Sequence, residues 1–371
     1  MNHLPDADVL KQRLTRAAEA TAAAELAALL VTPGPDLVYL TGYHALPLER
    51  LTCLVLPADD EPALVVPFLE VPAAKASTIT ALGLPVVGWQ ETEDPYALVA
   101  SMLPTQGVVG LDDSMAAAKV LHLRYAMPDM QQTLASRVLR DLRMRKDEAE
   151  IAALREAGAA IDRVHARVGD WLRAGRTEAE VGRDIAEAIL AEGHDRVDFV
   201  IVASGPNGAS PHHEVSDRVI EPGDPVVVDI GGTMPSGYCS DCTRTYSVGT
   251  PSADFTVLYE VLRQAQAESV AHVRPGVTAE SIDEAARSVI TAAGYGAQFV
   301  HRTGHGIGLE SHEEPYIVAG NDEQIAAGMA FSVEPGIYVE GRYGARIEDI
   351  VIVTDEGVES VNRQPHELVV L

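Results

Sequence analysis

Basic residues are scarce in this chain. Its 371 residues include 28 lysines and arginines against 55 aspartates and glutamates, which gives a formal net charge of −27. Such an acidic chain repels nucleic-acid phosphates, so we expect no nucleic-acid partner. Most of these charges are expected to lie on a solvated surface, where they favour solubility.

Cysteines are also few, namely Cys53, Cys239 and Cys242. A small, odd number is typical of a reducing compartment. Cys239 and Cys242 form a C-x-x-C pair of the kind that binds zinc or does redox chemistry, but no second pair accompanies it. Residues 238–248 are expected to form a strand, on which positions three apart point to opposite faces. We therefore interpret both cysteines as small buried residues beside Asp241.

Long apolar runs are absent too. No run approaches the roughly 20 residues that span a bilayer. The first six residues, MNHLPD, lack the basic start and apolar core of a signal peptide. We therefore expect a cytoplasmic protein with no membrane partner.

The chain does have the length and the aliphatic content for two domains. An alternation of helical and strand-like segments predicts a small α/β domain over residues 1–136. Helices are expected at 7–31, 70–77, 95–103 and 114–126, and strands at 37–41, 51–56, 62–66, 84–88 and 107–111. The basic segment 137–146 marks the boundary with a second domain, 137–371, which starts with a long helix over about 146–172.

The second domain contains an internal repeat. Residues 173–193 and 274–294 match at arginine, glycine, threonine, isoleucine, alanine and the closing glycine. Each copy predicts a helix that begins at an N-cap threonine, Thr177 or Thr278, and ends at the closing glycine. In the first copy, Glu180 adds the second half of a capping box.

The repeat continues around two carboxylates, Asp229 and Glu334. One glycine lies six residues before Asp229 and another two residues after it, and glycines have the same offsets from Glu334. The two carboxylates thus occupy equivalent places in two half-domains. We predict an α+β domain made by duplication, with a pseudo-two-fold axis near which ligands from both halves converge.

Five residues with ligand side chains lie in or beside apolar or glycine-rich stretches: Asp229, Asp241, His305, Glu334 and Glu348. An unpaired buried carboxylate costs several kcal/mol, so such groups are paired or bind metal. These stretches offer no matching set of basic residues, so we do not expect structural salt bridges to explain them. An oxygen-rich set with one nitrogen suits Mn, Co or Zn and argues against a sulfur site.

The spacing of these residues favours one shared centre. Asp229 and Asp241 are twelve residues apart, and Glu334 and Glu348 are fourteen apart, so an antiparallel hairpin can bring each pair together. His305 lies between glycines, which let the backbone approach a crowded site. Four carboxylates and one imidazole would satisfy two metals that share bridging oxygens, and such a centre deprotonates a water and polarises a carbonyl.

The segment 301–313, HRTGHGIGLESHE, resembles the signature of proline-specific metallopeptidases of the "pita-bread" fold, the Xaa-Pro dipeptidases (prolidases) and aminopeptidase P. The motifs VVVDIGG, YCSDCTRT, SVEPGIY and ARIEDIVIVT agree with it, and the resemblance covers roughly residues 147–360. The segment TGYHALPLERLTCLVLP is similar, more loosely, to the smaller creatinase/prolidase N-terminal domain. Ser311 departs from the family pattern, which has Ile or Val there; we expect little effect on the chemistry.

The resemblance implies a metal-binding role for each of the five residues. Asp229 would bind one metal, Asp241 and Glu348 would bridge both metals, and His305 and Glu334 would complete the other. Glu334 would also take the proton from the bridging water.

The resemblance implies further roles around the metals. His212 and His312 would bind the substrate or stabilise the tetrahedral intermediate, while His301 and Arg346 would line the proline side of the pocket. Arg346 has an alternative role as a supporting partner of the Glu348 cluster. His213 matches no family role and is expected only to pack nearby.

The resemblance thus implies hydrolysis of the Xaa-Pro bond in dipeptides by a hydroxide that bridges two divalent ions per subunit, with Mn expected first and Co or Zn as alternatives. It also implies a homodimer that acts on small peptides with proline at the second position. The short N-terminal domain favours a prolidase; the alternative is an aminopeptidase P that acts on longer peptides. A metal-free creatinase-like hydrolase and a pseudo-enzyme that serves as a binding module are disfavoured, because all five ligands are present.

Overall fold

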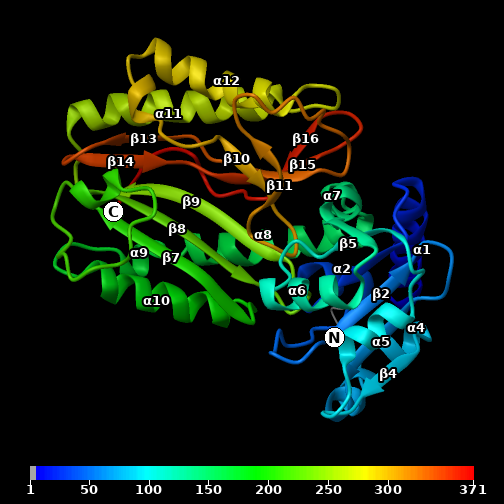
Figure 1. The fold of residues 1–371 in the computed structure, drawn as a ribbon. Coiled ribbons are helices and arrows are strands. Elements are labelled where there is room, and N and C mark those ends of the chain that lie inside the picture. Colours follow the sequence, from blue (N-terminus) through cyan, green and yellow to red (C-terminus); the bar gives the residue numbers. More distant parts are fainter. Residues whose placement is uncertain (1–5) are drawn as a thin grey trace. The chain divides into compact units, whose positions relative to one another are not determined.

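The computed structural model describes residues 6–371. These residues divide into two compact units between Arg143 and Met144, a division that falls inside the basic segment 137–146. Figure 1 labels many of the helices and strands of both units. None of the described helices combines the length and the apolar character that a membrane span requires.

The N-terminal unit is built on a six-stranded sheet. Its strands are β1 (Ala28–Val31), β2 (Cys53–Pro57), β3 (Ala63–Pro67), β4 (Val86–Trp89), β5 (Gly107–Leu111) and β6 (Met130–Leu134), in the order β4-β3-β2-β1-β5-β6. Its helices are α1 (Ala7–Ala23), α2 (Pro35–Thr41), α3 (Val71–Lys75), α4 (Thr78–Leu82), α5 (Pro95–Ser101), α6 (Ala117–Ala126) and α7 (Ser136–Met144). Parallel and antiparallel pairs coexist in this sheet, which confirms the predicted α/β class.

Two of the predicted elements of this unit are wrong. The helix expected over 7–31 ends at Ala23, and Ala28–Val31 form strand β1, in the middle of the sheet and fully buried. The strand expected at 37–41 is instead helix α2, which begins with Pro35 and ends at Thr41, followed by Gly42 in the left-handed conformation. A short apolar run looks the same in a buried strand and in a helix, so periodicity alone does not separate them.

The C-terminal unit contains two larger sheets and a hairpin. Its strands are β7 (Arg196–Ser204), β8 (Pro225–Thr233), β9 (Cys239–Ser247), β10 (Gly304–Gly306), β11 (Glu313–Ile317), β12 (Ala330–Val333), β13 (Gly336–Val339), β14 (Tyr343–Arg346), β15 (Asp349–Val353), β16 (Val358–Ser360) and β17 (Val369–Val370). The sheets have the orders β17-β9-β8-β7 and β11-β10-β12-β15-β16, and β13 pairs with β14.

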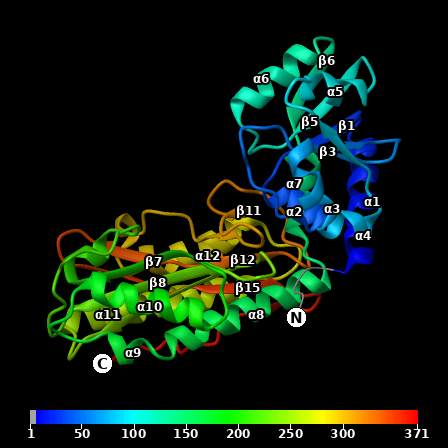
Figure 2. The same ribbon diagram turned by 90° about the horizontal axis from the view of Figure 1, so that it is seen from below.

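Helices cover the outer faces of these sheets. They are α8 (Glu148–His165), α9 (Val168–Trp171), α10 (Glu178–Ala191), α11 (Ala253–His272) and α12 (Ala279–Ala292). Helices α8 and α10 pack on the sheet of β7, β8 and β9 through one apolar cluster (Figure 2). Helices α11 and α12 pack on the strands of the second half (Figure 1). Polar side chains of the inner faces can therefore meet between the two halves.

The duplication predicted from the repeat is visible in the backbone. Thr177, at the start of α10, forms an isolated bridge with Val219, and Thr278, at the start of α12, forms one with Gln324. In both halves the bridge ties the start of the helix to the segment that leads into the strand of a candidate ligand. This agreement confirms two equivalent halves.

The predicted helix ends are confirmed with one exception. Thr177 and Glu180 form the capping box, with each side chain accepting from the other residue's amide. Thr278 also occupies the N-cap position, but its side chain makes no capping hydrogen bond. Gly193 and Gly294 have φ angles of 108° and 90°, which favour glycine.

The C-x-x-C pair is structural, as expected. Cys239 and Cys242 are buried free thiols at either side of β9. Cys242 belongs to the cluster beneath α8 and α10, whereas Cys239 packs in a different cluster. Their side chains thus point to opposite faces of the strand and cannot form one site together.

Candidate functional site

The first two candidate ligands lie on one hairpin. In the antiparallel pairing of β8 and β9, Asp229 faces Thr243, and Asp241 lies two residues before Thr243. Asp229 and Asp241 therefore project from the same face of the sheet. On β8 the alternate residues, such as Val228, pack against the helices. The alternation of valines with Asp229 thus places the carboxylate on the inner face, opposite the helices.

The second pair of candidate ligands comes from the other half. Strands β12 and β15 are antiparallel, and Val333 faces Asp349. Glu334 and Glu348 are the next residues beyond this pair, so the two carboxylates lie side by side. Asp229 lies inside β8, whereas Glu334 directly follows β12.

His305 reaches the centre from strand β10. Its amide donates to Ser332 Oγ at 3.0 Å. A Cβ atom at Gly304 would overlap the carbonyl of Ser332, and one at Gly306 would overlap the carbonyl of Glu314. The two glycines are therefore required by close backbone contacts around His305.

All five predicted ligands meet in one cluster. Possible ligand atoms of Asp229, Asp241 and Glu348 lie within 4.8 Å of one another, and so do those of His305, Glu334 and Glu348. Glu348 thus belongs to both groups, as a bridging carboxylate would. His305 Nε2 lies 3.2 Å from Glu334 Oε1 and 3.7 Å from Asp241 Oδ2.

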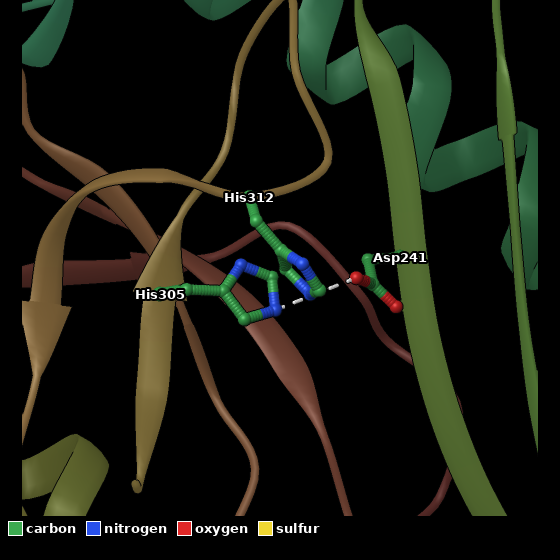
Figure 3. A group of neighbouring side chains, drawn as sticks. All are labelled: Asp241, His305 and His312. Carbon is green, nitrogen blue, oxygen red and sulfur yellow. Dashed lines mark ion pairs between the residues drawn. The ribbon is translucent and has the colours of Figure 1, made fainter. Parts of the chain in front are cut away.

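His312 joins this cluster at its edge. It forms a third group with Asp241 and His305, and the three side chains converge from two strands and a loop (Figure 3). The rings of His305 and His312 meet edge to face with centroids 4.0 Å apart. Burial, together with the nearby His305 and Arg302, lowers the pKa of His312 to about 4. His312 is therefore neutral near pH 7.

The carboxylates lie so close together that each one disfavours ionisation of the others. Burial and the neighbouring carboxylates raise the pKa values of Asp241 and Glu348 well above the usual range. Burial also acts to raise the pKa of Glu334, but the hydrogen bond and charge of His305 outweigh it and lower that pKa to about 2. Four carboxylates so arranged attract cations strongly.

Among the described residues, Arg346 is the guanidinium that bonds directly to a carboxylate of this cluster. Its Nη2 donates to Asp229 Oδ2 at 2.5 Å, and its Nε donates to Thr243 Oγ1 at 3.2 Å. Asp229 therefore has a basic partner, although the sequence offers no matching set for all the carboxylates. One guanidinium does not balance four carboxylates, so the ion pair leaves most of the negative charge unmatched.

The residues present fit a divalent cation. Asp229 Oδ1 is buried and has no hydrogen-bond partner among the described residues. A buried oxygen without a partner is costly, and a bound cation would remove that cost. The donors are carboxylate oxygens and one imidazole nitrogen, a set that binds Mn, Co or Zn.

Tyr338, which the sequence reasoning missed, connects Arg346 to His301. Its hydroxyl accepts from Arg346 Nη1 at 2.7 Å and lies 2.8 Å from His301 Nε2. His301 Nδ1 lies 2.7 Å from the carbonyl of Arg302, which only accepts, so Nδ1 carries the proton and Tyr338 donates to Nε2. Burial is the main reason why the pKa of His301 is lowered. Both ring nitrogens of a neutral His301 are thus engaged by neighbouring groups.

The cluster opens into a cavity of about 670 Å³. The five candidate ligands line it together with all four predicted substrate residues, His212, His301, His312 and Arg346. Phe199, Val200 and Ile201 from β7 give it an apolar side. This size and this mixture of apolar and convergent polar groups are typical of small-molecule sites.

Comparison with known proteins identifies the class. Residues 152–355 match the model of metallopeptidase family M24, and residues 13–145 match the creatinase/prolidase N-terminal domain. The chain belongs to metallopeptidase family M24 and is a hydrolase of peptide bonds.

Its relatives include named dipeptidases. It is 58% identical over 367 residues to the probable dipeptidase PepE of Mycobacterium tuberculosis, covering 99% of this chain and 98% of that protein. The crystal structure of dipeptidase PepE from Mycobacterium ulcerans is similar, with a TM-score of 0.96, 56% identity and 99% of each chain covered. The Xaa-Pro dipeptidase of Lactobacillus helveticus is 37% identical, over 90% of this chain and 92% of that protein.

Proposed function

We propose that this protein is a metal-dependent dipeptidase that cleaves the bond between a first residue and a following proline. The cluster around the unpartnered Asp229 Oδ1, open to a peptide-sized cavity, carries the proposal. The likeness to a Xaa-Pro dipeptidase over most of both chains supports the substrate class. We further propose that it works as a homodimer in the cytoplasm.

Two divalent ions would be held by the five candidate ligands, Asp229, Asp241, His305, Glu334 and Glu348. We expect Mn first, with Co or Zn as alternatives. Bound ions would supply an activated water and polarise the peptide carbonyl. The membership of Glu348 and Asp241 in two groups each supports their role as bridging ligands.

Glu334 would take the proton of the attacking water. Its Oε1 accepts from Ser332 Oγ at 3.0 Å and lies 3.2 Å from His305 Nε2. Both contacts fall on Oε1, so Oε2 is the atom that would receive the proton. Glu334 is ionised at neutral pH, as a proton acceptor must be, because its pKa is lowered to about 2.

His212 and His312 would bind the substrate at the mouth of the cluster. A neutral His312 can donate a hydrogen bond to an oxygen of the substrate without adding a charge. The ring carbons of His301 and the nearby Arg346–Tyr338 pair would face the proline ring. His301 and the Arg346–Tyr338 pair would thus form one side of the substrate pocket.

Arg302 is our candidate for the free carboxylate that a dipeptide carries. It lines the cavity, its guanidinium stacks 4.3 Å from the ring centroid of Tyr316, and among the described residues no carboxylate lies within ion-pair distance of it. Arg346, by contrast, is already paired with Asp229. An arginine with an open fork suits a carboxylate well.

A substrate panel tests the proposed function. Metal-stripped protein is supplied with Mn, Co or Zn, and Xaa-Pro dipeptides are compared with Xaa-Pro-Xaa tripeptides by product release. We expect cleavage of the dipeptides only after metal is restored. Faster cleavage of the tripeptides would overturn the dipeptidase assignment in favour of an aminopeptidase P, and full activity without metal would overturn the metal dependence.

The role of Arg302 is tested by Arg302→Met. We expect kcat/KM for Leu-Pro to fall about 10-fold or more, through KM, because a charge-assisted hydrogen bond is lost. With Leu-Pro-amide, which has no carboxylate, wild type and variant should give equal rates. Equal losses on both substrates would contradict the assignment.

A further inference from the structure

The loop that carries His212 has little regular structure of its own. Between η2 (Gly205–Ala209) and β8 the chain forms no helix or strand, yet His212 lines the cavity. Residues Ser210-Pro211-His212-His213 form a tight turn, in which the amide of His213 donates to the carbonyl of Ser210 at 3.2 Å. Proline at the second position of this turn restricts its backbone. His212 therefore occupies the third position of the turn.

A buried carboxylate lies behind this turn. Glu178, the first residue of α10, is completely buried. Its Oε2 lies 2.8 Å from His213 Nε2 and accepts from Ser216 Oγ at 2.6 Å. Its Oε1 accepts from the amide and the hydroxyl of Ser204, both at 2.7 Å, and Asn207 Nδ2 lies 3.1 Å from each oxygen.

The donors to Glu178 come from both sides of His212 in the sequence. Ser204 and Asn207 precede the turn, whereas His213 and Ser216 close and follow it. One carboxylate thus contacts residues at both ends of the loop that carries His212. Its place at the N-terminus of a 14-residue helix adds a favourable dipole.

This arrangement is not a general requirement of the repeated helix. In the second half, Ala279 is the first residue of α12 and carries no carboxylate. The Glu178 cluster therefore belongs to the half that presents His212 to the cavity.

We propose that the His213–Glu178 pair is a positioning device that holds the turn and thereby aims the His212 side chain at the substrate. His213 is then neither idle nor a ligand, which revises the expectation that it only packs nearby. The inference rests on the proposed function, because the proposed function assigns His212 to the substrate.

The test is a double-mutant cycle of His213→Ala and His212→Ala, measured as kcat and KM for Leu-Pro on the metal-loaded enzyme. A misplacement of about 1 Å can cost about 10²-fold in rate, so we expect His213→Ala to lower kcat about 10- to 100-fold. In the His212→Ala background the same change should lower kcat less than twofold. Equal losses in both backgrounds would overturn the proposal.

Two further variants serve as controls. His213→Gln places an amide donor near the position of Nε2 and should restore most of the activity; no restoration would count against the His213–Glu178 hydrogen bond. His272→Ala removes a histidine that bonds to Ser281 on the far helices and should leave kcat unchanged. Glu178 keeps its serine and asparagine donors in His213→Ala, so this variant should fold with an unchanged metal content.

A crystal structure of His213→Ala gives a readout independent of activity. We expect the turn 210–213 to be displaced or disordered, with the cluster around Glu334 unchanged. An unaltered turn would overturn the positioning role even if the variant loses activity. Loss of all Xaa-Pro cleavage in the wild type, with a displaced turn in the variant, would instead overturn the proposed function alone.

Discussion

Among individual residues, Asp229 shows most directly how charge is arranged in the site. One of its oxygens is bound by Arg346, and the other is buried without a partner among the described residues. A buried oxygen without a partner is costly, so we expect this atom to bind a cation. Glu334, its equivalent in the other half, is held differently, by His305 and Ser332.

The different surroundings of Glu334 lead to a prediction for Glu334→Gln. Loss of a proton acceptor lowers rates by about 10² to 10⁴-fold, and we expect a fall of that size in kcat for Leu-Pro. Excess metal should not restore the rate, because the amide cannot take the proton. Metal content, measured by mass spectrometry, separates this effect from weaker binding.

The matched control is the exposed Glu340, on the same segment of chain. Glu340→Gln should leave both kcat and metal content unchanged. Near-normal turnover in Glu334→Gln would exclude it as the base.

At the scale of elements, the two repeated helices start alike but are capped differently. Thr177 caps α10 with two reciprocal hydrogen bonds, whereas Thr278 makes no capping bond to α12. Both threonines nevertheless form an isolated backbone bridge, Thr177 with Val219 and Thr278 with Gln324. The sequence match of the two helix starts thus hides a difference in local stability.

This difference predicts unequal effects of the same substitution. Thr177→Ala should lower the free energy of unfolding by about 1 kcal/mol, because a side-chain cap is lost, and Thr278→Ala should lower it by clearly less. Urea denaturation of both variants measures the two values. Equal losses would mean that the capping box of α10 contributes little.

The helices and strands also show which features the sequence does not predict. The sequence predicts too long a helix over 7–31, because Ala28–Val31 continue an alanine- and leucine-rich stretch and only the sheet around β1 makes them a strand. The five candidate ligands were predictable, because each breaks an apolar or glycine-rich run. The partners of Asp229 and His213 were not, because Arg346 and Glu178 lie far away in the sequence and no local pattern links them.

For the whole molecule, the buried histidine His165 should make stability depend on pH. Burial, and after it the charge of Arg244, lower its pKa from 6.5 to about 3. The unfolded chain therefore binds a proton below pH 6.5 that the folded protein does not bind until about pH 3. The contribution of His165 to the free energy of unfolding is fully present above pH 6.5. It is lost as the pH falls through this window, by about 1.4 kcal/mol per pH unit.

His165→Gln tests this dependence, because glutamine cannot titrate. Between pH 6.5 and 5 we expect wild type to lose about 2 kcal/mol more unfolding free energy than the variant. Urea unfolding at both pH values provides the comparison. Parallel losses in the two proteins would show that other groups control acid unfolding.

The ion pair between Asp229 and Arg346 also bears on the order in which the chain folds. It joins residues 117 positions apart, one from each half. Contacts so distant in sequence form only after the loop between them has closed, which slows folding. A chain emerging from the ribosome would thus carry Asp229 without its counter-charge until the second half is made. The candidate metal centre is then expected to be the last part of this unit to assemble.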